Sequence, residues 1–91
     1  MYSRKTTIRN KTGLHARPAS DFIGCASKFK SKIVIKKLSD EEEANAKSIV
    51  MLLALGLGEG EEIEIYAKGE DEVEADDTLI DLVDSKFGED K

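Results

Sequence analysis

Cysteine is nearly absent from this 91-residue chain: Cys25 is the only one, so no disulfide can form within the chain. A lone cysteine fits a protein that works in a reducing compartment. Long apolar runs are also missing, and no stretch approaches the roughly 20 apolar residues that a membrane-spanning helix requires. The first residues are polar and lack the apolar segment of a secretory signal. The sequence therefore predicts a cytoplasmic protein without membrane insertion.

A net positive charge is missing as well. The formal charge is −5, from 14 Lys and Arg against 19 Asp and Glu. A nucleic-acid-binding protein needs a basic face to neutralise phosphates, so the charge argues against that class of function. With 40% apolar and 36% charged residues, the composition predicts a globular fold. The length predicts one domain, spanning residues 1–91, with a modest core.

The order of hydrophobic patterns predicts an α+β fold. Residues that alternate or are β-branched predict strands over 2–9, 32–36, about 41–45 and 61–68. Helical spacing predicts helices over 16–29, 48–55 and 70–87. The order β-α-β-β-α-β-α predicts a two-layer domain with helices packed on one face of a sheet. The acidic stretch 39–43 is expected to be a solvated hairpin tip and not a metal site, because three adjacent glutamates cannot all face one ion.

Two residues fit these hydrophobic patterns only in part. Cys25 lies at the edge of the apolar stripe of the first predicted helix, and we expect a buried, unreactive thiol. Asp76 falls on the apolar face of the last predicted helix, so either its first turn is exposed or the phase of the helix is shifted. The other residues expected on that face are apolar: Val73, Leu79, Ile80, Val83 and Phe87.

The only histidine, His15, directly precedes the first predicted helix. Histidine is not a favoured N-cap, and forgoing Ser, Asp or Asn costs about 1 kcal/mol, which suggests that the position serves another purpose. Pro18 is tolerated in the first turn, since its missing N–H would have no intrahelical partner. The alternative is a loop histidine without a function. A metal site is not expected, because the chain has no second histidine and Cys25 lies on a different helix face.

The surroundings of His15 favour phosphoryl chemistry. The positive end of a helix keeps the imidazole neutral and nucleophilic, and it attracts a phosphoryl group to the backbone N–H groups of Ala16 and Arg17. The side chain of Arg17 adds a permanently charged guanidinium, whose paired N–H groups can bind phosphate oxygens. Gly13 allows a tight turn and a close backbone approach. Together these features predict covalent phosphoryl transfer through His15.

The predicted helix at 48–55 is too apolar to be covered on all sides by so small a chain. If Met51, Leu52 and Leu55 face the core, the remaining residues Ile49, Val50 and Leu53 form an exposed arc. Such a patch is typical of a docking surface for a partner protein. Ser48 is the natural N-cap. Its alternative role is as a phosphorylation site, where a phosphate would weaken docking beside the patch.

Two separate motifs resemble one family. Gly13-Leu14-His15-Ala16-Arg17-Pro18-Ala19 is similar to the active-site signature of HPr, the histidine-containing phosphocarrier of the bacterial phosphoenolpyruvate-dependent sugar phosphotransferase system. Asn45-Ala46-Lys47-Ser48-Ile49 is similar to its regulatory-serine motif, which leans toward the Gram-positive branch. The resemblance implies an open-faced sandwich, with three helices on one face of a four-stranded antiparallel sheet.

The resemblance also implies roles for particular residues. His15 would accept a phosphoryl group on Nδ1 from phosphorylated enzyme I and pass it to enzyme IIA proteins, and Arg17 would stabilise it together with the N–H groups at the helix start. Ser48 would be phosphorylated by an ATP-dependent kinase/phosphorylase, and the product would bind a catabolite-control repressor. The expected docking residues are Ser20, Ile49, Val50 and Leu53. A monomeric carrier without cofactor is implied, not an enzyme.

Two alternatives remain open at this point. One is a regulatory module that acts through Ser48. The other is a phosphorelay domain of nitrogen metabolism or of a dihydroxyacetone kinase system. The chain also departs from the family pattern. The hairpin at 39–43 is longer by about two residues, and Asp76 stands where an apolar residue is commoner. The second helix of the family often has a small or polar residue and a Met or Phe at the positions of Val50, Met51 and Leu53.

Overall fold

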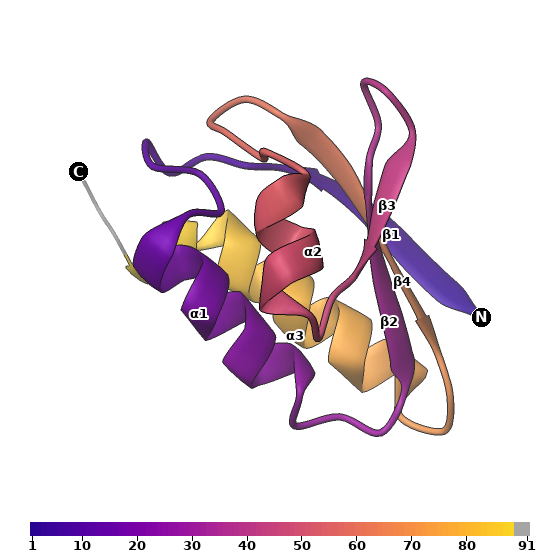
Figure 1. The fold of residues 1–91 in the computed structure, drawn as a ribbon. Helices are drawn as coiled ribbons and strands as arrows, with labels where there is room; N and C mark the ends of the chain where they lie inside the picture. Colours follow the sequence, from indigo (N-terminus) through magenta and orange to yellow (C-terminus); the bar gives the residue numbers. More distant parts are fainter. Residues whose placement is uncertain (89–91) are drawn as a thin grey trace.

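The structure, a computed structural model, describes residues 1–88 and confirms the predicted order of elements. The elements are β1 (Tyr2–Thr7), α1 (Ala16–Ala26), β2 (Lys32–Lys37), β3 (Glu42–Asn45), α2 (Ile49–Ala54), β4 (Glu62–Lys68), α3 (Glu72–Asp84) and the short turn η1 (Lys86–Gly88). All three α-helices lie on the same side of the sheet, as Figure 1 shows. The predicted α+β, two-layer architecture is therefore correct.

The four strands form one antiparallel sheet in the order β1-β4-β2-β3. The two central strands, β4 and β2, alternate most regularly: Ile63, Ile65 and Ala67 are buried, and the residues between them are not. In the register of the sheet Ile65 lies opposite Ile35. The short β3 lies where the sequence predicted a strand, and it is an edge strand of the sheet.

The core lies between this sheet and the helices. Helix α1 contributes Ala19 and Phe22, and α3 contributes Leu79, Ile80 and Val83, all of them buried. Polar contacts also join β1 to α3: the Tyr2 hydroxyl and the Arg4 guanidinium each donate to Asp77 at 3.0 Å, and Thr6 donates to Asp84. The edge strand β1 is thereby fixed to α3 by side chains as well as by pairing with β4.

The other face of the sheet is not covered by any described element, and most of its residues are polar, with Val34 and Tyr66 as partly buried exceptions. One row across the four strands runs Lys5, Glu64, Lys36, Glu43, with each residue opposite the next in the register. Opposite charges that face each other on neighbouring strands stabilise the pairing. The alternation of charge along this row matches the solvent-exposed side of the predicted two-layer fold.

Asp76 lies on the apolar face of α3, as its place in the helical pattern predicted, and the phase of the helix is confirmed by the burial of Leu79, Ile80 and Val83. The first turn of α3 is exposed at Val73, which was expected on the apolar face, whereas Asp76 is fully buried. Neither carboxylate oxygen of Asp76 has a hydrogen-bond partner within residues 1–88. Burial, with a further contribution from the charge of Asp77, raises the pKa of Asp76 to about 7, although Arg4 acts in the opposite direction.

The hairpin between β2 and β3 is closed by the four residues from Leu38 to Glu41. The Glu41 N–H donates to the Lys37 carbonyl at 2.8 Å, and Glu41 has a left-handed backbone with φ of 63°. The glutamates that follow are exposed. A solvated acidic hairpin tip is therefore correct, and no group of three potential metal ligands occurs among residues 1–88.

Candidate functional site

The loop before α1 is built around a buried asparagine. Asn10 is 2% exposed, and its side-chain amide donates to the Gly13 carbonyl at 2.9 Å and to the Thr12 hydroxyl at 3.2 Å. The Gly13 N–H returns a bond to the Asn10 carbonyl at 3.1 Å. These bonds fix the turn that delivers the chain to His15. Asn10 was not identified from the sequence as part of the site.

Gly13 allows this loop to pack directly on the segment that follows α2. Its φ is 65°, and a Cβ added there would lie 2.3 Å from the Leu57 carbonyl oxygen. The same oxygen accepts a bond from the Leu14 N–H at 2.8 Å. Only glycine combines this backbone conformation with so close an approach. The close approach predicted at Gly13 is confirmed.

His15 is the N-cap residue of α1, and its side chain takes no part in capping. Its backbone is extended, with φ −140° and ψ 151°, and the imidazole is exposed. The next residue, Ala16, has φ of 51°, a left-handed conformation that a residue with a Cβ adopts at a cost. The predicted position of His15, directly before the first helical turn, is confirmed.

Hydrogen-bond donors are available around this imidazole. No bond within residues 1–88 engages the backbone N–H of Ala16 or of Arg17, and Pro18 has no N–H. The Arg17 side chain is exposed and forms no ion pair in the described part of the chain. Pro18 is buried, which fixes the first turn of α1 against the protein. An exposed imidazole beside unpaired N–H groups and a guanidinium can accept and hold an anionic group.

The second motif forms the N-terminus of α2. Ser48 is the N-cap, as predicted: its Oγ accepts a bond from the Met51 N–H at 3.3 Å. The Asn45 side chain accepts from the Lys47 N–H at 2.9 Å, and the Lys47 ammonium donates to the Phe29 carbonyl at 2.7 Å. Ser48 is half-buried, and its hydroxyl lies at the start of the apolar helix.

The apolar surface of α2 is larger than the sequence predicted. Ile49, Val50 and Leu53 are exposed, as expected, and Val50 most of all at 74%. Met51 was expected to face the core, but it is 46% exposed. The reason is that this short helix touches the core along one line only, through Leu52 and Leu55, which are three residues apart. We call the four exposed side chains, Ile49, Val50, Met51 and Leu53, the α2 apolar patch.

The two motifs lie at opposite ends of one surface. Helices α1 and α2 lie side by side in Figure 1. The Leu14–Leu57 bond ties the start of α1 to the segment after α2, and the Lys47–Phe29 bond ties the start of α2 to the segment after α1. The helices are therefore antiparallel, and α2 with its patch extends from the Ser48 end toward His15. Ser20 is exposed on α1, one turn after Ala16.

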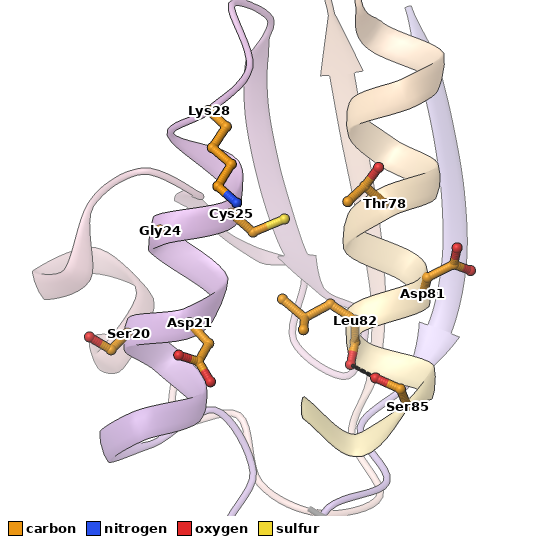
Figure 2. Close-up of a pocket in the computed structure, with 9 residues that line it drawn as sticks. All are labelled: Ser20, Asp21, Gly24, Cys25, Lys28, Thr78, Asp81, Leu82 and Ser85. Atoms are coloured by element: carbon orange, nitrogen blue, oxygen red, sulfur yellow. Dashed lines mark hydrogen bonds between the residues drawn. The ribbon is translucent and has the colours of Figure 1, made fainter. Parts of the chain in front are cut away.

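The groove between α1 and α3 is separate from these motifs. Figure 2 shows this groove, of about 680 Å³, with the Cys25 sulfur pointing toward α3. It contains neither His15 nor Ser48, and Ser20 is the only predicted site residue that lines it. Cys25 is half-buried, not fully buried as predicted, because it borders the groove. Burial raises the pKa of its thiol, with a smaller opposing effect from Lys28, so the thiol remains protonated at neutral pH.

Comparison with known proteins identifies the family of these motifs. The model of a family described as "PTS HPr component phosphorylation site" matches residues 2–85. The phosphocarrier protein HPr of Neisseria meningitidis is 40% identical over 98% of both chains. The HPr-like protein Crh of Bacillus subtilis is 41% identical over 82% of this chain and 86% of that one. The phosphocarrier protein NPr of Proteus mirabilis is 38% identical over 96% of both chains.

Solved structures agree with these relatives. The crystal structure of HPr-C-His from Thermoanaerobacter tengcongensis has a TM-score of 0.96 and 47% identity, and it covers 100% of both chains. An HPr dimer from the same organism has a TM-score of 0.77 and 48% identity, over 98% of this chain and 100% of that one.

Proposed function

Because the chain belongs to the HPr family of phosphotransferase-system phosphocarriers, we propose that it carries a phosphoryl group on His15. The observation that carries this proposal is the local geometry of the first turn of α1. His15 is exposed and takes no part in capping, while the N–H groups of Ala16 and Arg17 have no partner within residues 1–88. The side chain of Arg17 is exposed at the same turn and forms no ion pair within residues 1–88.

In this proposal the neutral imidazole attacks phosphorus through Nδ1. The N–P bond forms as the bond to phosphorylated enzyme I breaks, and the donor group keeps the electron pair of that bond. The negative charge on the transferred group is then balanced by the two backbone N–H groups and by the guanidinium of Arg17. In the second transfer an enzyme IIA protein takes the phosphoryl group, and His15 returns to its starting state. The protein is thus a stoichiometric carrier without a cofactor, not an enzyme.

The α2 apolar patch is the surface on which enzyme I and enzyme IIA proteins dock in this proposal. Four neighbouring apolar side chains are exposed on this one short helix, and a contiguous apolar patch of this kind is typical of a site that binds another protein. The patch extends from α2 toward the His15 end of α1, so a partner that covers it would also cover the imidazole. Ser20, exposed on α1, would lie at the border of such an interface.

Regulation through Ser48 is the second part of the proposal. Its hydroxyl stands at the start of the helix that carries the patch. A phosphate there would place about two negative charges beside the docking side chains, and it would weaken docking without unfolding the protein. The partners implied are an ATP-dependent kinase/phosphorylase and a catabolite-control repressor that binds the phosphorylated form.

A second candidate function is supported by the relatives. One relative is named the HPr-like protein Crh and another the phosphocarrier protein NPr. These names favour, as an alternative, a regulatory or phosphorelay module that acts outside sugar uptake, mainly through Ser48. The two functions differ in whether His15 accepts a phosphoryl group from enzyme I.

We further propose that the protein acts in the cytoplasm as a monomer, with residues 1–91 forming a single domain. No helix within residues 1–88 is long and apolar enough to cross a membrane. A monomer leaves the α2 apolar patch free for transient partners. One structure of a relative is described as an HPr dimer, so light scattering at several concentrations is the direct test of this point.

The experiment that tests the proposed function is intact-mass measurement after incubation with enzyme I and phosphoenolpyruvate. We expect one added phosphoryl group that is lost on acid treatment and absent from His15→Ala. If an active control carrier in the same tube is phosphorylated and this protein is not, the function proposed for His15 is wrong. An ATP-dependent kinase assay on Ser48 would then test the alternative.

A further inference from the structure

The chain after α3 makes a left-handed turn that needs an explanation. Lys86 has φ of 59°, Phe87 has φ of 57° and ψ of 30°, and Gly88 has φ of 78°. Two successive residues with a Cβ in this conformation are unfavourable, and they persist only where the surroundings impose them. The turn lies close to the end of the chain, where ordering is usually weakest.

The feature that imposes this turn is the burial of one aromatic ring. Phe87 is only 9% exposed, and it belongs to the hydrophobic core. A left-handed turn directs this side chain back into the protein at a point where α3 has already ended. Burial of a phenylalanine ring offsets the unfavourable backbone.

The ring lies beside the first turn of α1. Phe87 and Gly88 line one side of a cavity of about 380 Å³, and Arg17, Pro18 and Asp21 line the other side. Figure 1 shows the yellow end of the chain next to the start of α1. The segment that carries Phe87 is therefore in position to support the turn that carries His15 and Arg17.

No side-chain cap supports the start of this turn. The His15 side chain gives no cap, and Ala16 is itself in a left-handed conformation. Pro18 is buried, and it lines the same cavity as Phe87. The support that a capping side chain gives to most helices is thus supplied here by packing.

Asp21 makes the position of the Arg17 side chain critical. It lies one helical turn after Arg17, at the spacing where opposite charges on a helix attract each other. The two side chains line the same cavity, yet they form no ion pair within 4.0 Å. A guanidinium that turned back onto Asp21 would be lost to a phosphoryl group on His15.

We propose that Phe87 is a positioning residue for phosphoryl transfer: its ring packs beside the first turn of α1 and keeps the Arg17 guanidinium from pairing with Asp21, so that it can bind a phosphoryl group on His15. This inference rests on the proposed function and adds a residue far from His15 in the sequence. Loss of the ring enlarges the cavity between Arg17 and Asp21. The guanidinium then settles on the carboxylate, and the phosphoryl group loses its charged partner.

The test compares the rate of phosphorylation by enzyme I for four variants and the unmodified protein. We expect Phe87→Ala to lower the transfer rate by about tenfold or more, as small misplacements of charged groups in a reacting complex do. Phe87→Leu, which still fills the cavity, should retain most of the rate. Val83→Ala also removes buried atoms at the end of α3, but the residue does not line this cavity, so it should leave the rate unchanged. Asp21→Asn combined with Phe87→Ala should restore the rate.

Two readouts separate positioning from loss of stability. Melting temperatures show whether Val83→Ala matches Phe87→Ala in stability, and the assay is run well below both. Hydrolysis of the phosphorylated protein should be faster for Phe87→Ala, because Arg17 no longer stabilises the phosphoryl group. If Phe87→Ala does not fold at the assay temperature, Phe87→Val takes its place.

The outcomes are distinct from those that test the proposed function. If the unmodified protein accepts no phosphoryl group, the proposed function is wrong, whatever Phe87 does. If the unmodified protein is phosphorylated and Phe87→Ala transfers at the same rate, the positioning role is wrong. Equal losses in Phe87→Ala and Val83→Ala, or no recovery with Asp21→Asn, would also overturn it.

Discussion

The α-carbon of Gly13 lies so close to the Leu57 carbonyl that an added Cβ would come within 2.3 Å of its oxygen. This contact joins the loop before α1 to the segment after α2. The neighbouring Leu14 N–H donates to the same oxygen. The position of His15 therefore depends on a helix that lies far from it in the sequence.

The first prediction concerns this contact. Gly13→Ala combines a left-handed backbone with a steric clash, so it should lower the free energy of unfolding by about 2 kcal/mol or more. It should also slow phosphorylation, because the His15 loop must move away from Leu57. Chemical denaturation and the enzyme I assay measure the two effects. Gly24→Ala is the control, since a Cβ there meets no atom within 4 Å. Equal stability of the two variants would contradict the steric argument.

The second prediction concerns the imidazole itself. His15→Ala should abolish phosphoryl transfer and change the free energy of unfolding by no more than about 0.5 kcal/mol, because an exposed side chain that makes no cap adds little stability. Thermal unfolding and mass measurement test both parts on one sample. Retained transfer in this variant would show that another residue accepts the group.

The third prediction concerns charge at the start of α2. Ser48→Asp should weaken the affinity for enzyme I, because it places a negative charge beside the α2 apolar patch. Ser48→Asn is the matched control, since asparagine also caps a helix but carries no charge. Binding of both variants to immobilised enzyme I measures the difference. An unchanged affinity for Ser48→Asp would count against docking on the patch.

The fourth prediction concerns the patch. Val50→Glu should weaken binding to enzyme I, because it places a charge at its most exposed apolar residue. Val73→Glu is the control: Val73 is 51% exposed, but it lies on α3 and not on α2. Both changes should leave the melting temperature nearly unaltered. Similar binding of the two variants would show that the effect is one of net charge and not of a docking surface.

The fifth prediction concerns pH and the buried Asp76. Its pKa in the folded protein is raised to about 7 from an ordinary 3.8, so between these values the unfolded chain releases this proton before the folded protein does. The contribution of Asp76 to stability therefore falls as the pH rises from about 4 to about 7, with a slope of up to about 1.4 kcal/mol per pH unit. Above about pH 7 this fall ends.

A comparison with Asp76→Asn isolates this effect. The melting temperature of the unmodified protein should fall more between about pH 4 and about pH 7 than that of the variant. Asp71 acts in the opposite direction at more acid pH: bonds from Ser31 and from the Lys30 N–H lower its pKa, so its stabilising effect is lost as the pH falls. Parallel curves for the two proteins would show that Asp76 is not the titrating group.

The sequence was sufficient for features that depend on local pattern. Alternation predicts β4, and a serine before an apolar run predicts the cap of α2, because both signals act over a few neighbouring residues. The exposure of Met51 could not be predicted in this way. Which side of a short helix faces the core depends on how that helix lies on the sheet, and this is a property of the tertiary structure.

The candidate site likewise combines features that follow from the local sequence with features that depend on the tertiary structure. The position of His15 at a helix start follows from its own neighbours in the sequence. The place of Phe87 beside Arg17 does not, because it requires a left-handed turn of residues that carry a Cβ. Sequence patterns rarely indicate such a turn without glycine. Gly88 indicates a turn at this place, but it does not indicate that Lys86 and Phe87 share its left-handed conformation.

The row Lys5, Glu64, Lys36, Glu43 has a consequence for the behaviour of the protein in a crowded solution. A bare sheet face usually invites a second sheet to stack on it, and that is a common route to aggregation. Here each charge already has an opposite charge beside it. A second sheet would have to strip water from all of them, with only the partly buried Val34 and Tyr66 to add apolar contact on this face. The charged row therefore makes the stacking of a second sheet costly, whereas the helical side presents the apolar side chains that a partner can bury.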